Sequence, residues 1–234
     1  MKVNKDTFSK FVELINLASE IEIKECILRG DANSLKVLAV TPSRVLMLRG
    51  EIAGDFSELG VVGVDDVSLL KKVVGKCKAD VEIVKTQNTL EITSGKLEVS
   101  LVLRNPEYIL TDIDESKYKS FQDKASGNEF SLCADDVSEF ANYYGIFGKE
   151  VAVNGKGNLV TFKLNSGSNK LNLKLPVTES IEEFGVKIGS LFMTVLAIIK
   201  NDVKMSMKDK AQVIEITTTI GDITFSYIVA PLVA

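Results

Sequence analysis

Apolar residues recur along the chain at two different periods, and each period predicts one kind of element. In the first segment with helical periodicity, Phe8, Phe11, Val12 and Ile15 stand at i, i+3, i+4 and i+7, the spacing of one apolar helix face. Asp6 is the expected N-cap of this helix. The segments that predict helices span residues 6–18, 66–77, 135–147 and 189–200.

Most of the remaining chain alternates apolar and polar residues or is rich in β-branched residues, and both patterns are typical of strands. The expected strands span residues 81–84, 90–93, 97–103, 159–164, 171–175, 213–219 and 223–229. Gly95 and Gly221 stand in short polar breaks between strands, as hairpin turns require. Helices interspersed with antiparallel strands predict an α+β fold.

Residues 111–128 follow neither the helical nor the strand period. They are rich in Asp, Glu, Lys, Ser and Gln and show little apolar pattern, which favours an interdomain linker. This linker divides the chain into an N-terminal domain, residues 1–110, and a C-terminal domain, residues 129–234.

The two halves resemble each other in order and in spacing. The first half contains Gly63-Val64, Ser68-Leu69-Leu70, Val73 and Asp80-Val81. The second half contains, at unchanged spacing, Gly185-Val186, Ser190-Leu191-Phe192, Val195 and Asp202-Val203. A repeat period of more than about 100 residues indicates domain duplication rather than a solenoid.

The composition argues against an enzyme. The chain has no histidine, which excludes a Ser-His-Asp triad, a Cys-His pair and zinc sites with histidine ligands. Its three cysteines, Cys26, Cys77 and Cys133, have no CxxC spacing and are expected to be buried thiols. No P-loop is present, and Asp112 and Asp114 fall in the linker as solvated charge. We therefore expect no catalytic residue, no metal and no cofactor.

Location and charge leave several partners open. The N-terminus has no secretory signal, and the longest apolar stretch, residues 188–199, is too short to span a bilayer. We expect a soluble intracellular protein with no membrane partner. The net charge of −4 would by itself argue against nucleic acid, but an uneven charge distribution can override the sum.

Three short motifs, together with the duplicated order of elements, resemble the proliferating cell nuclear antigen family of DNA sliding clamps. The ending at residues 226–231, Ser-Tyr-Ile-Val-Ala-Pro, is similar to the family's Tyr-Tyr-Leu-Ala-Pro. Residues 138–141, Ser-Glu-Phe-Ala, are similar to the Gly-Glu-Phe-Ala that opens the third helix. Residues 40–45 occupy the place of the Met-Asp-Ser-Ser-His-Val loop. The short chain favours a phage-type member.

The resemblance implies a DNA clamp fold: two duplicated domains, each with two helices packed on antiparallel sheets, that close into a ring as a homotrimer. Twelve helices, each about 10 Å wide, give a perimeter of ~120 Å and leave ~28 Å clear for duplex DNA. The eight helices of a dimer would leave only ~15 Å. Strand edges near residues 108–112 and 169–177 are expected to pair between subunits.

The function implied is that of a processivity factor. Such a ring encircles double-stranded DNA without reading its sequence, tethers a DNA polymerase and is placed by a clamp loader. It would act in the cytoplasm of the host cell if the protein comes from a phage, and in the nucleus if it is eukaryotic or viral.

Lysines on and beside the helices are the expected DNA contacts, since ammonium groups attract phosphates independently of sequence. The candidates are Lys10, Lys71, Lys72, Lys76, Lys78, Lys187 and Lys200. Ordinary solvated lysines remain the alternative for each. The third helix departs from the family's pattern, because it has Asp135, Asp136 and Glu139 but no basic residue.

The family's partners insert a short peptide beneath the interdomain linker. The matching positions form a candidate groove at Val40, Arg44, Val45, Ile113, Tyr118, Ile228, Ala230 and Pro231. Core strand positions are the alternative for Val40, Val45 and Ile228.

Two other functions stay open at this point. One is a monomeric processivity factor that holds DNA on one basic face. The other is a non-DNA α+β protein, such as a ligand-binding or virion protein.

Overall fold

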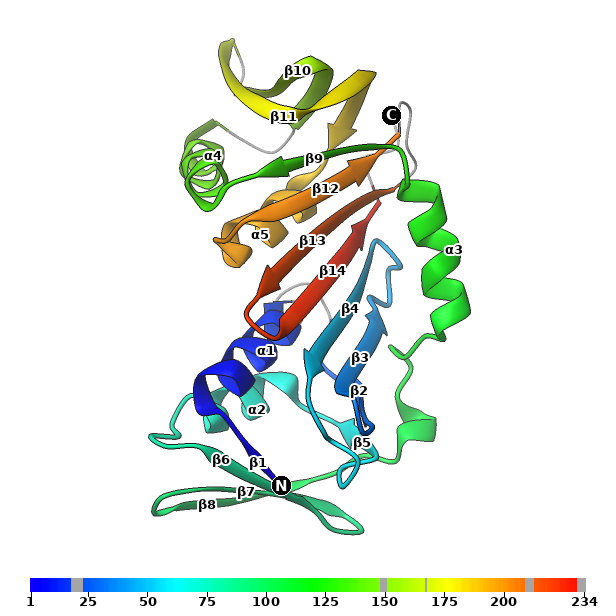
Figure 1. Ribbon diagram of the computed structural model, residues 1–234, viewed down its shortest axis with the longest axis vertical. Helices are drawn as coiled ribbons and strands as arrows, with labels where there is room; N and C mark the ends of the chain where they lie inside the picture. Colours follow the sequence, from blue (N-terminus) through cyan, green and yellow to red (C-terminus); the bar gives the residue numbers. More distant parts are fainter. Residues whose placement is uncertain (18–22, 148–150, 167, 209–212, 231–234) are drawn as a thin grey trace. The chain divides into compact units, whose positions relative to one another are not determined.

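The chain folds into two compact units, each built from helices packed on antiparallel strands (Figure 1). The first unit comprises Met1–Glu115 and Ile220–Phe225, and the second comprises Ser116–Thr219 and Ser226–Ala234. The computed structural model describes residues 1–17, 23–147, 151–166, 168–208 and 213–230. Within these residues no helix is long and apolar enough to cross a membrane.

The first unit has two sheets and two helices that pack against each other. Its elements are β1 (Lys2–Val3), α1 (Lys5–Leu17), β2 (Cys26–Gly30), β3 (Ser34–Val40), β4 (Leu46–Ala53), β5 (Val61–Val64), α2 (Val67–Val74), β6 (Val81–Lys85), β7 (Thr89–Ser94), β8 (Leu97–Val102) and the short 3-10 helix η2 (Pro106–Tyr108). One sheet has the order β1-β6-β7-β8 and the other β5-β2-β3-β4. Beside β4 lie the first residues of β14 (Ile223–Val229), and Ala53 N donates to the Asp222 carbonyl oxygen at 3.0 Å.

The second unit repeats this plan with longer strands. Its elements are α3 (Glu115–Ala125), β9 (Asn128–Leu132), α4 (Ala134–Phe147), β10 (Val151–Ser166), β11 (Asn169–Ile188), α5 (Ser190–Ile199), β12 (Val203–Met207), β13 (Ile214–Ile220) and the end of β14. The strands β14, β13, β12 and β9 are neighbours in that order, while β10 and β11 form a separate two-stranded ribbon.

The predicted duplication is visible in the strand pairing. The base of the β10–β11 ribbon pairs Val151 with Ile188, as β2 pairs with β5, and its outer part pairs Leu164 with Leu171, as β3 pairs with β4. Register shifts at Gly157 separate the two parts. A short strand and two longer strands then follow α2 in the first unit and α5 in the second.

The four predicted helices are present, with small differences at their ends. The first begins at Lys5, and its cap is Asn4 rather than Asp6, because Asn4 Oδ1 accepts hydrogen bonds from Asp6 N at 3.0 Å and Thr7 N at 3.1 Å. The predicted end at Ala18 lies outside the described residues.

The predicted linker contains a helix, α3, that the sequence pattern did not indicate. It buries only Tyr118 and Ala125, so its apolar stripe is too narrow to give a clear helical period. Polar contacts hold it instead: Gln122 Nε2 donates to Glu215 Oε1 at 2.8 Å, and Ser206 Oγ donates to the Ala125 carbonyl oxygen at 3.1 Å.

Aromatic side chains fill the core of each unit at places where a glycine makes room for them. In the first unit the Phe11 and Phe225 rings lie 5.3 Å apart, and a Cβ at Gly50 would stand 2.3 Å from the Phe225 ring. In the second unit a Cβ at Gly155 would stand 2.2 Å from the Phe184 ring.

The prediction of three buried thiols is wrong at one position. Cys26 and Cys77 are buried, but Cys133 is exposed at the start of α4, where its Sγ donates to Asp136 Oδ2 at 3.1 Å. Burial raises the pKa of the Cys26 thiol to about 12, with the carboxylates of Asp112 and Glu25 adding to the effect.

Replacement of Gly50 by Ala is expected to lower the free energy of unfolding by about 1–3 kcal/mol, because the new methyl group overlaps the Phe225 ring. Urea unfolding followed by circular dichroism measures the change. Gly185→Ala is the control, because a Cβ there meets only Asn154 Oδ1, at 3.2 Å. Equal unfolding midpoints for the two variants would contradict this account of the core.

The exposure of the cysteines predicts their reactivity. In the native protein at pH 8, iodoacetamide should modify Cys133 first, while Cys26 stays protonated and protected. Mass spectrometry counts the labels. Cys133→Ser should remove the fast label, and denatured protein should take up three. Fast native labelling of Cys26 would show that the β2 region opens readily.

Candidate nucleic-acid interface

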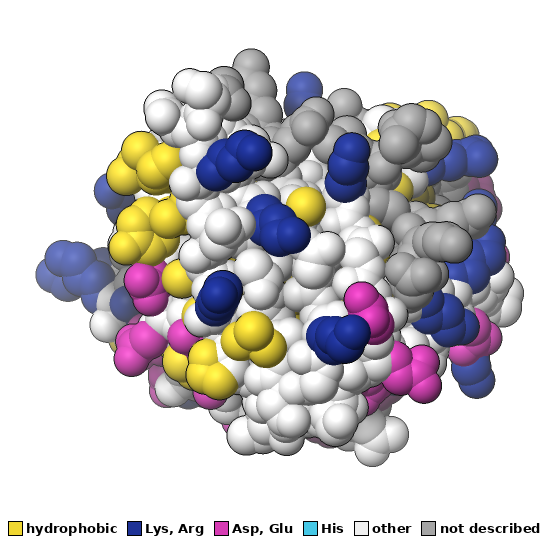
Figure 2. Space-filling model, turned by 90° about the horizontal axis from the view of Figure 1, so that it is seen from above, with side chains coloured by type: hydrophobic (Ala, Val, Ile, Leu, Met, Phe, Trp, Pro, Cys, Tyr) yellow, Lys and Arg dark blue, Asp and Glu magenta, His cyan; other side chains and the backbone are white. Residues whose placement is uncertain are grey.

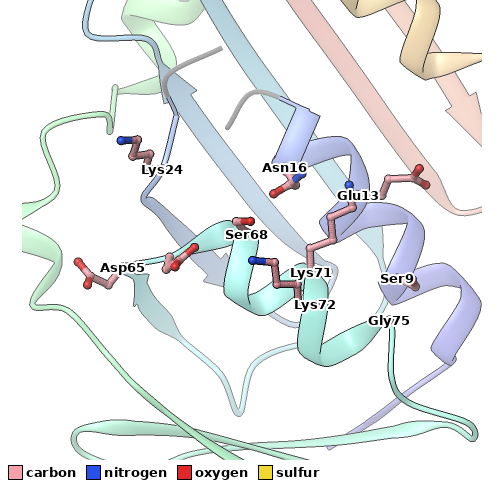
Figure 3. Close-up of a pocket in the computed structure, with 10 residues that line it drawn as sticks. Ser9, Glu13, Asn16, Lys24, Asp65, Ser68, Lys71, Lys72 and Gly75 are labelled. Atoms are coloured by element: carbon pink, nitrogen blue, oxygen red, sulfur yellow. The ribbon is translucent and has the colours of Figure 1, made fainter. Parts of the chain in front are cut away.

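The two helices of the first unit pack side by side and border a hollow of about 1000 Å³ (Figure 3). The side chain of Lys71 extends from α2 toward Glu13 and Asn16 of α1, and that of Lys72 extends from the same helix on the side of Ser68. The lining residues are Ser9, Glu13, Asn16, Lys24, Asp65, Asp66, Ser68, Lys71, Lys72 and Gly75.

The acidic side chains of this hollow already have partners. Asp66 caps α2, with its carboxylate accepting a hydrogen bond from Leu69 N at 2.8 Å. Asp65 pairs with Arg104 at 2.8 Å, and Glu13 pairs with Lys10 at 3.1 Å. Their negative charge is therefore partly compensated within the unit.

The lysines of the hollow, unlike its acidic side chains, are not engaged by neighbouring side chains in the described part of the chain. Among the residues that the structure describes, Lys24, Lys71 and Lys72 take part in no ion pair and no side-chain hydrogen bond. Lys24 and Lys72 are exposed and Lys71 is half-buried. Three ammonium groups are thus available to an anion at one place, and phosphate oxygens are suitable acceptors.

Two more predicted lysines extend this basic region along the chain. Lys76 and Lys78 follow the C-terminal end of α2, and both are exposed. Cations at this end also interact favourably with the helix dipole, so a structural role and an anion-binding role are compatible. Lys24 was not among the predicted contacts, because a single lysine before a strand gives no periodic signal.

The structure does not bring the other predicted lysines into this group. Lys10 lies on α1, but its ammonium group is engaged by Glu13. Lys187 and Lys200 belong to the second unit. Lys187 stands on strand β11 opposite Ala152, and Lys200 is the left-handed C-cap of α5, with φ of 48°.

Some of the acidic residues of α4, the third helix expected from the sequence, have structural roles. Asp135 and Asp136 stand in its first turn, where carboxylates interact favourably with the helix dipole. Asp136 also accepts a hydrogen bond from the Cys133 thiol, and Asp202 accepts one from Ala134 N at 2.8 Å. Helices α4 and α5, which contain no Lys or Arg, therefore present far less positive charge than α2.

Four candidate groove residues lie in the first unit. Val40 ends β3, and a tight turn before β4 contains Arg44, with φ of 58°, and Val45, which is 39% exposed. Thr41 fixes this turn, because its Oγ1 accepts from both Val45 N and Leu46 N at 3.1 Å. Ile113 is buried.

The remaining four groove candidates belong to the second unit. Tyr118 on α3 and Ile228 on β14 are buried, and Ala230 is half-buried. Pro231 lies outside the described residues. Arg44 and Val45 thus offer the most surface to a partner, and the peptide groove stays a prediction.

The sequence indicated that the carboxylates near the linker are solvated charges, but the structure shows ion pairs there. Both Asp112 oxygens accept from Arg29, at 2.9 and 2.5 Å, and Glu115 pairs with Arg49 at 3.1 Å. These ion pairs hold the start of the predicted linker against β2, which carries Arg29, and β4, which carries Arg49. In the described part of the chain no cluster of His, Cys, Asp and Glu could hold a metal ion.

No protein-family model and no curated protein matches this sequence. Solved structures do match. The proliferating cellular nuclear antigen of Entamoeba histolytica superposes with a TM-score of 0.80 at 13% identity, over 99% of this chain and 97% of its own.

Two archaeal structures give similar values. The A. fulgidus PCNA, solved with the C-terminal region of FEN-1 bound, has a TM-score of 0.76 at 14% identity, over 97% of this chain and 96% of its own. The PCNA2–PCNA3 complex of Sulfolobus tokodaii gives 0.77 at 14%, over 99% of both chains.

At these identities the likeness concerns the fold, and it covers nearly the full length of every chain compared. The α+β architecture of paired helices on antiparallel sheets, written twice, agrees with the one that the sequence motifs indicated. This chain has the fold of the PCNA-type DNA sliding clamps.

Proposed function

We propose that this protein is a non-enzymatic sliding clamp: a homotrimeric ring that encircles double-stranded DNA and tethers a DNA polymerase to it. The observation that supports this most directly is the hollow between α1 and α2. Lys24, Lys71 and Lys72 present ammonium groups there while the neighbouring acids are paired. Such groups attract phosphates without reading bases, as a clamp that slides requires.

The ring form of the proposal rests on sheet edges. Strand β4 has a neighbour in the first residues of β14. The duplication makes β8 of the first unit equivalent to β14, and it makes the outer part of β11 in the second unit equivalent to β4. Both β8 and β11 stand at the ends of their sheets. Joining β8 of one copy to β11 of the next satisfies both edges.

Such a contact is heterologous, so repeating it generates a ring or a filament rather than a two-fold dimer. This scheme places the subunit contact at β8 instead of at residues 108–112, where the sequence led us to expect it. Residues 106–108 form η2, and the Thr111 carbonyl oxygen accepts from Val40 N at 2.8 Å.

The partners follow from the same proposal. The A. fulgidus clamp was solved with a peptide region of another protein bound, and we infer that a polymerase peptide docks on this chain near Arg44 and Val45. A clamp loader would place the ring on DNA. We further propose a phage-type clamp that acts in the cytoplasm of the host cell.

Topology provides the decisive test of the ring. The protein should sediment as a trimer at micromolar concentration. Once loaded on a nicked circular plasmid, it should stay bound through gel filtration and be lost when the plasmid is linearised. A monomer that binds linear and circular DNA equally would instead indicate a one-face processivity factor.

The lysines of α2 provide a separate test. Replacement of Lys71, Lys72 and Lys76 by Ala should weaken binding to DNA and lower the slope of log K against log salt by roughly 2 to 3, about 0.9 for each lost phosphate contact. Fluorescence anisotropy over a salt series measures this slope.

The matched control removes the same charge from lysines that already have partners, Lys36, Lys156 and Lys208. It should leave the slope nearly unchanged. Equal slopes for the two triple variants would show that the hollow does not contact DNA.

A further inference from the structure

The outer part of the β10–β11 ribbon has one apolar face and one polar face. Cross-strand partners share a face in an antiparallel pair, and the pairs on the polar face are Thr161 with Lys174, Lys163 with Asn172, and Asn165 with Lys170. Thr161 is half-buried and the other five are exposed. The residues that alternate with them along each strand are apolar and buried or half-buried. The solvent side of the ribbon therefore carries three lysines.

This stretch of the chain carries positive charge only. From residue 151 to residue 178 it has four lysines and no Asp or Glu, although the whole protein has a net charge of −4. The carboxylate that follows, on Glu179, already accepts hydrogen bonds from Thr178 Oγ1 and Ser131 Oγ, each at 3.0 Å. Figure 2 looks down on the end of the chain where β10 and β11 lie, and it shows Lys and Arg side chains spread over largely neutral surface.

Three of the four ribbon lysines are available to a partner. Lys163, Lys170 and Lys174 take part in no ion pair and no side-chain hydrogen bond within the described ranges. Lys156 differs from them, because its Nζ lies 2.8 Å from Glu183 Oε2. The positive charge that an approaching anion meets on this face is thus that of the three exposed lysines.

The three lysines form a zigzag along the ribbon. Lys163 lies opposite Asn172, which is midway between Lys170 and Lys174 on β11. At about 3.4 Å per residue, Lys170 and Lys174 stand roughly 14 Å apart along the ribbon, with Lys163 about 7 Å from each. Each strand of a DNA duplex carries a phosphate every ~3.4 Å of the helix axis. A backbone that follows the ribbon therefore passes a phosphate at each ammonium group.

The residues between the lysines favour a nucleic acid over an acidic protein. Thr161, Asn165 and Asn172 offer hydroxyl and amide donors, which are neutral groups that contact phosphate and sugar oxygens. The one aromatic residue between positions 151 and 178, Phe162, is buried. The face thus has no aromatic anchor of the kind that protein interfaces use and no platform for base stacking. Its chemistry fits a sugar–phosphate backbone whose bases are not read.

We propose that the polar face of the β10–β11 ribbon binds the phosphate backbone of a nucleic acid through Lys163, Lys170 and Lys174, as a second contact besides the lysines around α2. The two sets of lysines belong to different units, and the inference does not depend on the closure of a ring. The ribbon binds charge rather than sequence, so a duplex and a single strand are both ligands.

Replacement of the three lysines by Ala tests the ribbon site. The slope of log K against log salt should fall by roughly 2 to 3 with a short linear duplex, about 0.9 for each lost phosphate contact. With a single-stranded oligonucleotide it should fall by roughly 2, about 0.7 for each contact. Fluorescence anisotropy over a salt series measures both. The same decrease should appear in a protein that already lacks the three α2 lysines.

The ribbon offers its own matched control. Lys163→Ala should lower the duplex slope by about 0.9, whereas Lys156→Ala should leave it nearly unchanged, because that ammonium group is already paired with Glu183. All of these positions are exposed, so circular dichroism should show the same fold for every variant.

Chemical modification detects the contact directly. Acetic anhydride should acetylate Lys163, Lys170 and Lys174 readily in the unbound protein, and saturating duplex should slow their modification severalfold. Lys36, which is paired on another sheet, should react at the same rate with and without DNA. Mass spectrometry of peptides gives the rate at each lysine.

The outcomes separate this inference from the proposed function. An unchanged slope and unprotected ribbon lysines, with a normal loss of affinity in the α2 variant, would overturn the ribbon site and leave the clamp proposal intact. Binding of poly-glutamate, but of neither oligonucleotide, through the ribbon lysines would assign the face to an acidic protein instead. A loss of affinity in the ribbon variant alone would confirm the ribbon site and show that the hollow beside α2 does not contact DNA.

Discussion

An open sheet edge leaves a row of N–H and C=O groups without partners, and this constraint governs how the molecule is completed. The edge of β4 is satisfied within the chain by the first residues of β14, where Ala53 N reaches the Asp222 carbonyl oxygen. The duplication creates the same need a second time, at β8 and β11, which stand at the ends of their sheets with no further strand beside them in the described residues. In the proposed ring another copy of the chain would supply the missing partner.

Local pairing explains how a protein with a net charge of −4 can present positive charge to an anion. Around α2, Asp65 is engaged by Arg104, and Asp66 is used as a helix cap. The lysines beside them have no such partners in the described residues. The sum of charges is thus a poor guide, because what an approaching phosphate meets depends on which charges are already compensated.

The sequence predicted elements well wherever burial imposes a strong period. The wide apolar faces of α1, α2, α4 and α5 gave clear helices, but α3 buries only Tyr118 and Ala125 and was interpreted as a linker. Asn4 was missed as a cap because Asp6 is equally suited by type. The site was harder still, because the position of Lys24 in the hollow depends on packing between elements, which no local pattern records. The pairing of Lys10 with Glu13, by contrast, is an i, i+3 contact within α1 that the helical spacing could have indicated.

The two units have diverged in where they place positive charge. The first has lysines on α2 and just after it, whereas the second has an almost wholly apolar α5, an acidic first turn in α4 and lysines on α3 and on the β10–β11 ribbon. In the proposed ring the lysines around α2 would attract DNA, while α4 and α5 would add little positive charge to that surface. Salt would weaken this attraction, because exposed ammonium groups are screened and counterion release from DNA contributes less as the salt concentration rises.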